Sequence, residues 1–236
     1  MHYWNKANFQ GLLAVADCLE ARPELKLLAN YCRYREQGLR RAAFAELEAF
    51  LAASRCFGST TARSAAVEVL EANMRISGAH QFMTQPLIAR FLMPTLKAWM
   101  EEDAEANLPV RWLGMLDRDA ELLNRALVAC PEDMPVRKIL IDFALGWVDH
   151  ATHHLDESVF LGSPEEASSA LARAKALITE APEPEKLGYL NDEVRYFECL
   201  VADWQAYAQA PEGSFSQWCS ERGRNYEMPA KFYYRR

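Results

Sequence analysis

Three residues in the stretch Ile139–Gly162 have the types and the spacing to bind a metal ion. His150, His154 and Glu157 follow one another at i, i+4 and i+7. A helix advances about 100° per residue, so this spacing brings two imidazoles and a carboxylate to one side. These groups are ordinary ligands of Zn²⁺. Since imidazole titrates near neutrality, they also suit acid–base catalysis. The pattern predicts a metal-dependent or acid–base enzyme as one function.

The surrounding residues leave a second interpretation open. Metalloprotease helices place a glutamate directly after the first histidine as general base, and here Ala151 stands in that position. Protease chemistry is therefore disfavoured. The structural interpretation is a core histidine pair, hydrogen-bonded across a helix interface. His153 falls on another side of the helix, together with three aspartates that indicate a solvated edge: Asp142, Asp149 and Asp156.

The C-terminal segment is basic and aromatic and supplies a second candidate site. Arginine and tyrosine are enriched at protein interfaces, so the segment predicts a partner-binding surface. The alternative is that it packs back over the helices, with tyrosines inward and arginines on the acidic surface. The candidate partner-binding residues are Arg222, Arg224, Tyr226, Tyr233 and Tyr234. A similar cluster near the N-terminus comprises Tyr31, Arg33, Tyr34, Arg35, Arg40 and Arg41.

Composition and charge narrow the function classes. The 236 residues are 50% hydrophobic and 25% charged, which is ordinary for a globular protein. The net charge of -7 makes nucleic acid an unlikely partner, because such binding neutralises phosphates with Lys and Arg. The sequence contains no run of about 18 uncharged apolar residues, so no membrane span is expected. The six cysteines are dispersed, so a reducing, cytoplasmic location is expected.

The elements that must position these residues are expected to be helices throughout. Apolar residues recur at helical spacing, and no stretch alternates as a half-buried strand would. The histidines fall on a long helix predicted over Pro135–Ser158. The segment Gln85–Glu105 is also expected to be helical, with a kink at Pro94. Ser163 and Glu166 form a capping box that begins the next helix.

The expected fold is all-α, with about nine or ten helices stacked as antiparallel hairpins. We expect residues 1–236 to form a single all-helical domain. The one weak subdivision, into 1–106 and 107–236, is expected at the link Asn107-Leu108-Pro109.

Two segments between about residues 110 and 182 carry a family resemblance. Asp119–Asp133 resembles the second helix of a tetratricopeptide repeat, with Ala126 as the small residue and Pro131 as the closing proline. Ala170–Pro182 is similar. The helix Pro135–Ser158 is longer than the repeat's first helix, and the period of about 34 residues is not kept. The resemblance implies a superhelix of stacked hairpins.

Such arrays leave an extended surface for partners. The chain has neither a nucleophile elbow nor a glycine-rich phosphate loop. The expected function is therefore non-catalytic binding of a protein or peptide, as an adaptor or as the antidote of a basic toxin. No cofactor is expected, apart from a metal ion in the enzyme alternative.

Overall fold

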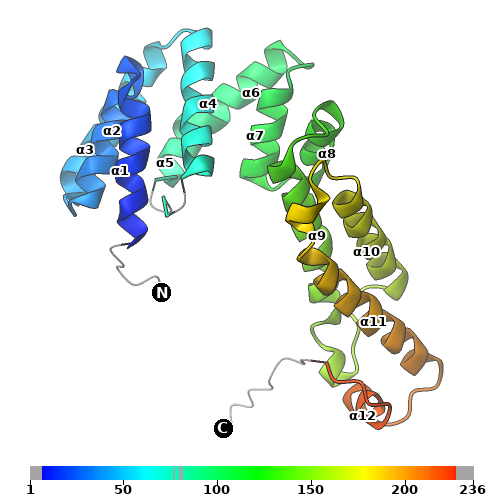
Figure 1. Ribbon diagram of the computed structural model, residues 1–236. Helices are drawn as coiled ribbons and strands as arrows, with labels where there is room; N and C mark the ends of the chain where they lie inside the picture. Colours follow the sequence, from blue (N-terminus) through cyan, green and yellow to red (C-terminus); the bar gives the residue numbers. More distant parts are fainter. Residues whose placement is uncertain (1–6, 77, 80–81, 227–236) are drawn as a thin grey trace. The chain divides into compact units, whose positions relative to one another are not determined.

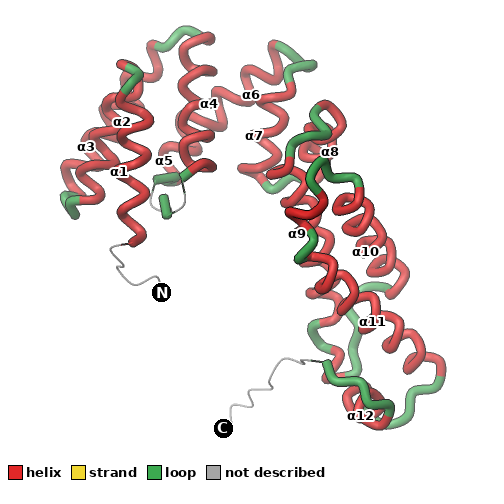
Figure 2. Tube along the Cα trace, viewed as in Figure 1, coloured by secondary structure: helices red, strands yellow, loops and turns green. Residues whose placement is uncertain are grey.

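Helices form all of the regular structure that is described. The computed structural model describes residues 7–76, 78–79 and 82–226 (Figure 1). These ranges contain no strand (Figure 2), so the prediction of an all-α fold is confirmed. Eleven of the described helices have seven residues or more, close to the number expected. In the same ranges, no helix combines the length and the apolar character that crossing a membrane requires.

The chain divides into two compact units, Met1–Asp117 (unit 1) and Arg118–Arg236 (unit 2). The weak boundary expected after residue 106 therefore lies inside unit 1. The helix that begins at Asn107 packs against the helix that ends at Glu102, so these two helices form one hairpin.

Unit 1 is a row of helices joined mostly by short turns. The helix α2 packs against both α1 and α3, and α4 packs against α1 and α6. The helix α7 packs against α6. The elements are α1 (Ala7–Glu20), η1 (Pro23–Leu25), α2 (Lys26–Glu36), α3 (Arg40–Ala53), η2 (Ser54–Cys56), α4 (Ser59–Arg75), α5 (Gln85–Leu87), η3 (Ile88–Leu92), α6 (Met93–Glu102) and α7 (Asn107–Asp117).

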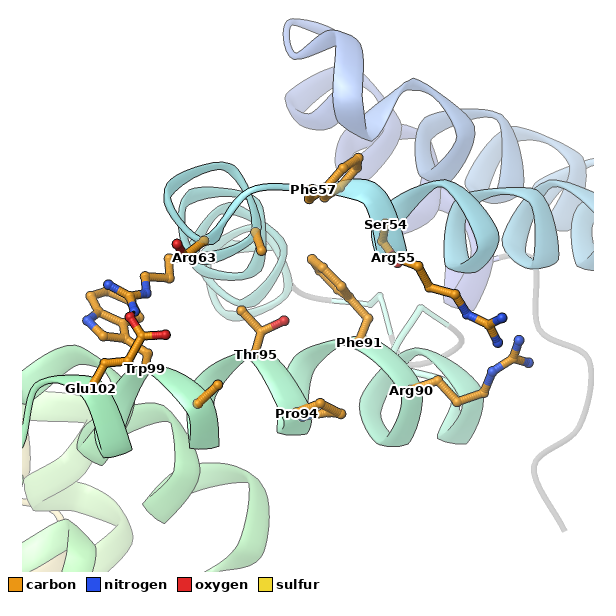
Figure 3. Close-up of a pocket in the computed structure, with 13 residues that line it drawn as sticks. Ser54, Arg55, Phe57, Arg63, Arg90, Phe91, Pro94, Thr95, Trp99 and Glu102 are labelled. Carbon is orange, nitrogen blue, oxygen red and sulfur yellow. The ribbon is translucent and has the colours of Figure 1, made fainter.

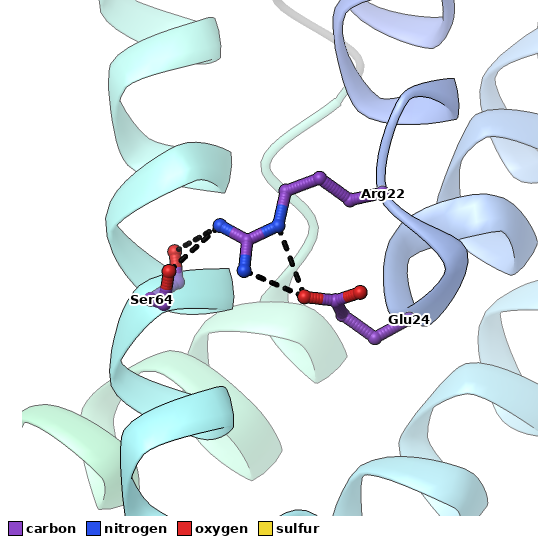
Figure 4. A network of polar contacts seen from close by, with 3 residues as sticks. All are labelled: Arg22, Glu24 and Ser64. Atoms are coloured by element: carbon purple, nitrogen blue, oxygen red, sulfur yellow. Dashed lines mark hydrogen bonds and ion pairs between the residues drawn. The ribbon is translucent and has the colours of Figure 1, made fainter.

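A polar network joins the turn after α1 to α4 (Figure 4). The guanidinium of Arg22 donates to Oγ of Ser64 at 2.7 Å and to the Ser64 carbonyl at 3.3 Å. It also donates to Oε1 of Glu24 at 2.6 and 2.9 Å. One side chain thus connects the α1–η1 turn with α4.

The proline expected to kink the segment 85–105 lies directly after a π-helix. Residues 88–92 form the π-helical turn η3, in which the amide of Met93 donates to the carbonyl of Ile88. Pro94 follows in the first turn of α6. Because proline has no amide hydrogen, it is tolerated where the hydrogen-bonding pattern changes. Single π-turns inside helices are frequent at functional sites.

Unit 2 is built around three long helices. The helix α10 packs against both α9 and α11, α8 packs against α9, and α12 packs against α11 and η4. The elements are α8 (Ala120–Ala129), α9 (Met134–Thr152), η4 (Leu155–Glu157), α10 (Pro164–Thr179), η5 (Pro184–Leu187), α11 (Leu190–Gln209) and α12 (Phe215–Glu221).

The expected capping box begins α10. Oγ of Ser163 accepts from the amide of Glu166 at 3.1 Å, and Oε2 of Glu166 accepts from the amide of Ser163 at 3.1 Å. Both hydrogen bonds satisfy amides that the first helical turn leaves without a partner. Asp133 likewise accepts from the amide of Val136 at the start of α9.

The helix α9 ends at Thr152, whereas the sequence pattern predicts that it continues to Ser158. The chain turns back at this point. Ser158 adopts a left-handed φ of 59°, and the amide of Leu161 donates to the carbonyl of Ala151 at 2.8 Å. The amide of Phe215 donates to Oγ of Ser158 at 3.0 Å. Packing of this turn against α12 thus replaces the last turns of the expected helix.

Candidate functional site

The early end of α9 changes the environment of the predicted metal ligands. His150 lies on α9, whereas His154 and Glu157 lie in the turn that follows. Nδ1 of His154 is 3.4 Å from Oε1 of Glu157. Among the described residues, no three His, Cys, Asp or Glu side chains are placed to hold a metal ion together. The predicted i, i+4, i+7 spacing requires one continuous helix through Glu157, and that prediction is wrong because α9 ends at Thr152.

The alternative of a core histidine pair is not seen either. His150 is exposed and His154 is half-buried. The rings of His153 and His154 meet edge to face, with centroids 5.2 Å apart. The histidines therefore lie at the solvent edge of unit 2, outside its apolar core.

The described part of the C-terminal segment packs back onto unit 2. The Tyr226 hydroxyl donates to Oδ2 of Asp203 on α11, and Nε of Arg224 is 3.3 Å from the same oxygen. The Arg222 guanidinium lies over the Trp218 ring at 4.1 Å. Burial and the hydrogen bond to Asp203 raise the pKa of Tyr226, so its phenol remains a donor. Of the five candidate partner-binding residues, these three make contacts within the chain.

The remaining two candidates, Tyr233 and Tyr234, lie outside the described residues. The N-terminal basic cluster also makes internal contacts. Arg33 pairs with Asp17 and Glu20 of α1, and its hydrogen bond holds the pKa of the Glu20 carboxyl below the usual value. Arg35 and Arg40 each lie 5.7 Å from the Phe44 ring centroid. Neither arginine-rich segment, where described, presents a continuous unpaired basic surface.

Loss of the Asp203 carboxylate is expected to release the C-terminal segment. Asp203→Ala removes the shared acceptor of Arg224 and Tyr226. With one hydrogen bond and one ion pair lost, each worth about 1 kcal/mol, tryptic cleavage after Arg224 should rise about tenfold or more. The matched control is Asp192→Ala, because Asp192 is on the same helix and its side chain is 84% exposed. Equal cleavage rates in both variants would show that Asp203 does not anchor the segment.

A groove in unit 1 has the character of a binding site. Its volume is about 280 Å³. The turn after α3, the first half of α4 and the segment η3–α6 form its walls (Figure 3). The π-turn described above contributes Arg90 and Phe91 to the lining, and Pro94 follows it. The change in helical hydrogen bonding is therefore located at the groove.

Aromatic side chains occupy the middle of the groove. The rings of Phe57 and Phe91 meet edge to face, with centroids 6.4 Å apart. Both contact the fully buried Phe50, at 6.2 and 5.0 Å respectively. Edge-to-face packing fixes the orientation of such rings. The apolar part of the groove is thus continuous with the core of unit 1 and rests on a rigid base.

The two ends of the groove carry arginines in different electrostatic environments. At one end, Arg63 forms an ion pair with Glu102 and lies 5.4 Å from the Trp99 ring centroid. At the other end, the Arg55 and Arg90 guanidiniums point toward one another (Figure 3).

Glu48 is the carboxylate beside the Arg55 end. It accepts from Arg90 at 2.6 and 2.9 Å, and these hydrogen bonds hold the pKa of Glu48 below its usual value. Glu48 is therefore ionised at neutral pH and already paired with Arg90. Arg55 is exposed, and its charge also lowers the pKa of the Glu48 carboxyl.

Two cavities of unit 2 have a different character. One, of about 300 Å³, includes Arg173, which donates to the side chain of Asn124. The other, of about 400 Å³, includes Lys175, which pairs with Glu198 at 3.0 Å. In each of these two cavities, the basic side chain already contacts another side chain of unit 2. The groove in unit 1 combines aromatic rings with two guanidiniums beside one carboxylate, because Arg90 binds Glu48 and the charge of Arg55 also acts on it.

The groove could not be predicted from the sequence, because its lining comes from two distant segments, residues 54–63 and 90–102. Residues 54–63 form a short turn, a loop and the start of α4, and residues 90–102 belong to an ordinary helical segment. Each contains only one or two arginines. The nearest signal is Pro94, which indicates that the helix around it is irregular. No family model, no curated protein and no solved structure matches the chain.

Proposed function

We propose that this chain is a non-catalytic protein that binds a protein or peptide, of the adaptor or toxin-antidote type, and that the groove in unit 1 receives a segment of the partner. The observation that carries the proposal is the groove itself, whose lining includes aromatic rings and, at one end, the exposed Arg55 and Arg90. Arginine and aromatic side chains dominate the binding energy of protein interfaces.

The size of the groove favours a peptide segment over a small metabolite. Its volume of about 280 Å³ lies at the lower limit of small-molecule sites, which typically measure about 300–1,000 Å³. Arg55, Arg90 and Glu102 at its rims are exposed. An open groove of this size suits one or two side chains of a longer chain that continues over the surface.

The resemblance of residues 110–182 to tetratricopeptide repeats belongs to the same proposal. Ala126 of α8 and Ala174 of α10 are fully buried, as the small residues of tetratricopeptide-like hairpins would be. Stacked hairpins of this kind commonly serve as binding surfaces. The enzyme alternative, based on His150, His154 and Glu157, has weaker support, because these side chains do not converge on one point.

A groove-filling substitution tests the proposal. Thr95 points into the groove (Figure 3), so Thr95→Trp should fill it without removing any described hydrogen bond. Lys97→Trp, at an exposed position of the same helix outside the lining, is the matched control. A displayed random-peptide library selected on the full chain should converge on a shared pattern.

The selected peptides should bind Thr95→Trp at least about tenfold more weakly than Lys97→Trp, because one bulky side chain blocks the aromatic middle. Circular dichroism establishes that both variants are folded. If the library does not converge, or if its binders bind both variants equally, the groove is not the binding site.

A further inference from the structure

The charge at the Arg55 end of the groove indicates what kind of segment binds there. Arg55 and Arg90 contribute two positive charges and Glu48 contributes one negative charge, so these three side chains sum to +1. At the opposite end, Arg63 and Glu102 sum to zero. The charge is thus uneven along the groove, although the whole chain carries -7.

A negatively charged group of a ligand would balance the positive charge at the Arg55 end of the groove. Two guanidiniums that face one another repel unless carboxylates lie between or beside them, and here Glu48 is bound by Arg90. Arg55 acts on the same Glu48 carboxylate through its charge, and its exposed guanidinium can still reach a ligand. Guanidinium and carboxylate groups match in geometry and form paired hydrogen bonds.

We infer that the groove binds an acidic peptide segment, in which an Asp or Glu carboxylate contacts Arg55 and Arg90 and a neighbouring bulky apolar side chain packs on Phe57 and Phe91. This inference rests on the proposed function and specifies its ligand. A carboxylate within a peptide is preferred over a small free anion, because the same groove also has aromatic rings in its lining: Phe91 follows Arg90 in η3, and both line the groove.

Short synthetic peptides provide the test. The probe is an acetylated and amidated peptide with the core Phe-Asp-Phe, which places an apolar side chain on either side of the acid. Its analogues have the cores Phe-Asn-Phe and Gly-Asp-Gly. Binding to the full chain is followed by amide chemical shifts of residues 54–63 and 90–102.

The Phe-Asp-Phe peptide should bind about two- to fivefold more tightly than Phe-Asn-Phe, as expected for a partly exposed ion pair. Arg55→Ala should abolish this preference. Arg41→Ala, which removes an exposed arginine of α3 outside the groove, should preserve it. Raising the salt concentration from about 0.01 M to about 1 M should also abolish it, because the Debye length falls from about 30 to 3 Å.

Each contrary result has a distinct meaning. Suppose that Phe-Asn-Phe binds as tightly as Phe-Asp-Phe, and that Thr95→Trp still blocks the binding of both peptides. The preference for an acidic residue would then be wrong, but the proposal that the groove binds a peptide would stand. If Gly-Asp-Gly binds as tightly as Phe-Asp-Phe, the carboxylate alone is sufficient for binding, and the inference is overturned. Absence of shifts at the groove with every peptide would also overturn it, and the library selection would then decide the broader proposal separately.

Discussion

Replacement of Phe50 by alanine is expected to lower the free energy of unfolding by about 3–5 kcal/mol. Phe50 is fully buried on α3, and its ring contacts Phe57 and Phe91 edge to face. Deleting the ring removes apolar burial and leaves a cavity that close-packed neighbours fill incompletely. Chemical denaturation followed by circular dichroism measures the loss.

The matched control for this prediction is Leu39→Ala, next to the start of the same helix. Leu39 is 50% exposed, so its truncation should change stability by no more than about 0.5 kcal/mol. Phe50→Ala should also weaken peptide binding, since Phe57 and Phe91 lose the ring that fixes them. A loss of stability below about 1 kcal/mol would show that Phe50 does not support a close-packed core.

Local signals explain why most helix limits were predictable. The hydrogen bonds of the capping box at Ser163 and Glu166 join residues three positions apart, so the sequence contains both partners. Asp133 caps α9 over the same short distance. Elements fixed by neighbours in the chain can be inferred from the chain alone.

The end of α9 could not be predicted in this way. No proline or glycine lies between Thr152 and Ser158, so local propensity permits the helix to continue. The turn is instead held by the amide of Phe215, which lies 57 residues further along the chain. A contact of that range overrides helix propensity, and the predicted metal-binding pattern depended on the missing helical turns.

The packing of the C-terminal segment also depends on contacts that could not be predicted from the sequence. Its composition fits both an interface and a segment packed on its own helices. The choice depends on Asp203, which accepts from Tyr226 and pairs with Arg224. Nothing in the sequence distinguishes Asp203 from other acidic residues of α11, because its partners are set by how the segment returns to the helix.

The second large effect is expected from Arg137, a buried arginine near the start of α9. Its Nη1 donates to the carbonyl of Leu177 at 3.0 Å, in the last turn of α10. Its Nη2 donates to the carbonyl of Pro131 at 2.8 Å, just after α8. The carbonyls at helix C-termini lack partners within the helix and carry partial negative charge. One guanidinium therefore stabilises the ends of two helices.

The hydrogen bonds around Leu177 explain why Arg137 is needed there. At the end of α10 the amide of Glu180 donates to the carbonyls of Ala176 and Ile178, and the amide of Ala181 donates to Ile178. The carbonyl of Leu177 receives neither of these amides. Without Arg137 this partly buried carbonyl would have one hydrogen bond fewer, which costs about 1–3 kcal/mol.

Arg137→Ala should therefore lower the free energy of unfolding by about 2–4 kcal/mol, because two carbonyls lose their donor and a cavity forms. Arg137→Lys should recover little, since a single ammonium cannot span both carbonyls as the planar fork does. The surface control is Arg195→Ala, whose side chain is 71% exposed. If Arg137→Met proves as stable as the native chain, volume alone accounts for the role of Arg137, and the two hydrogen bonds contribute no net stability.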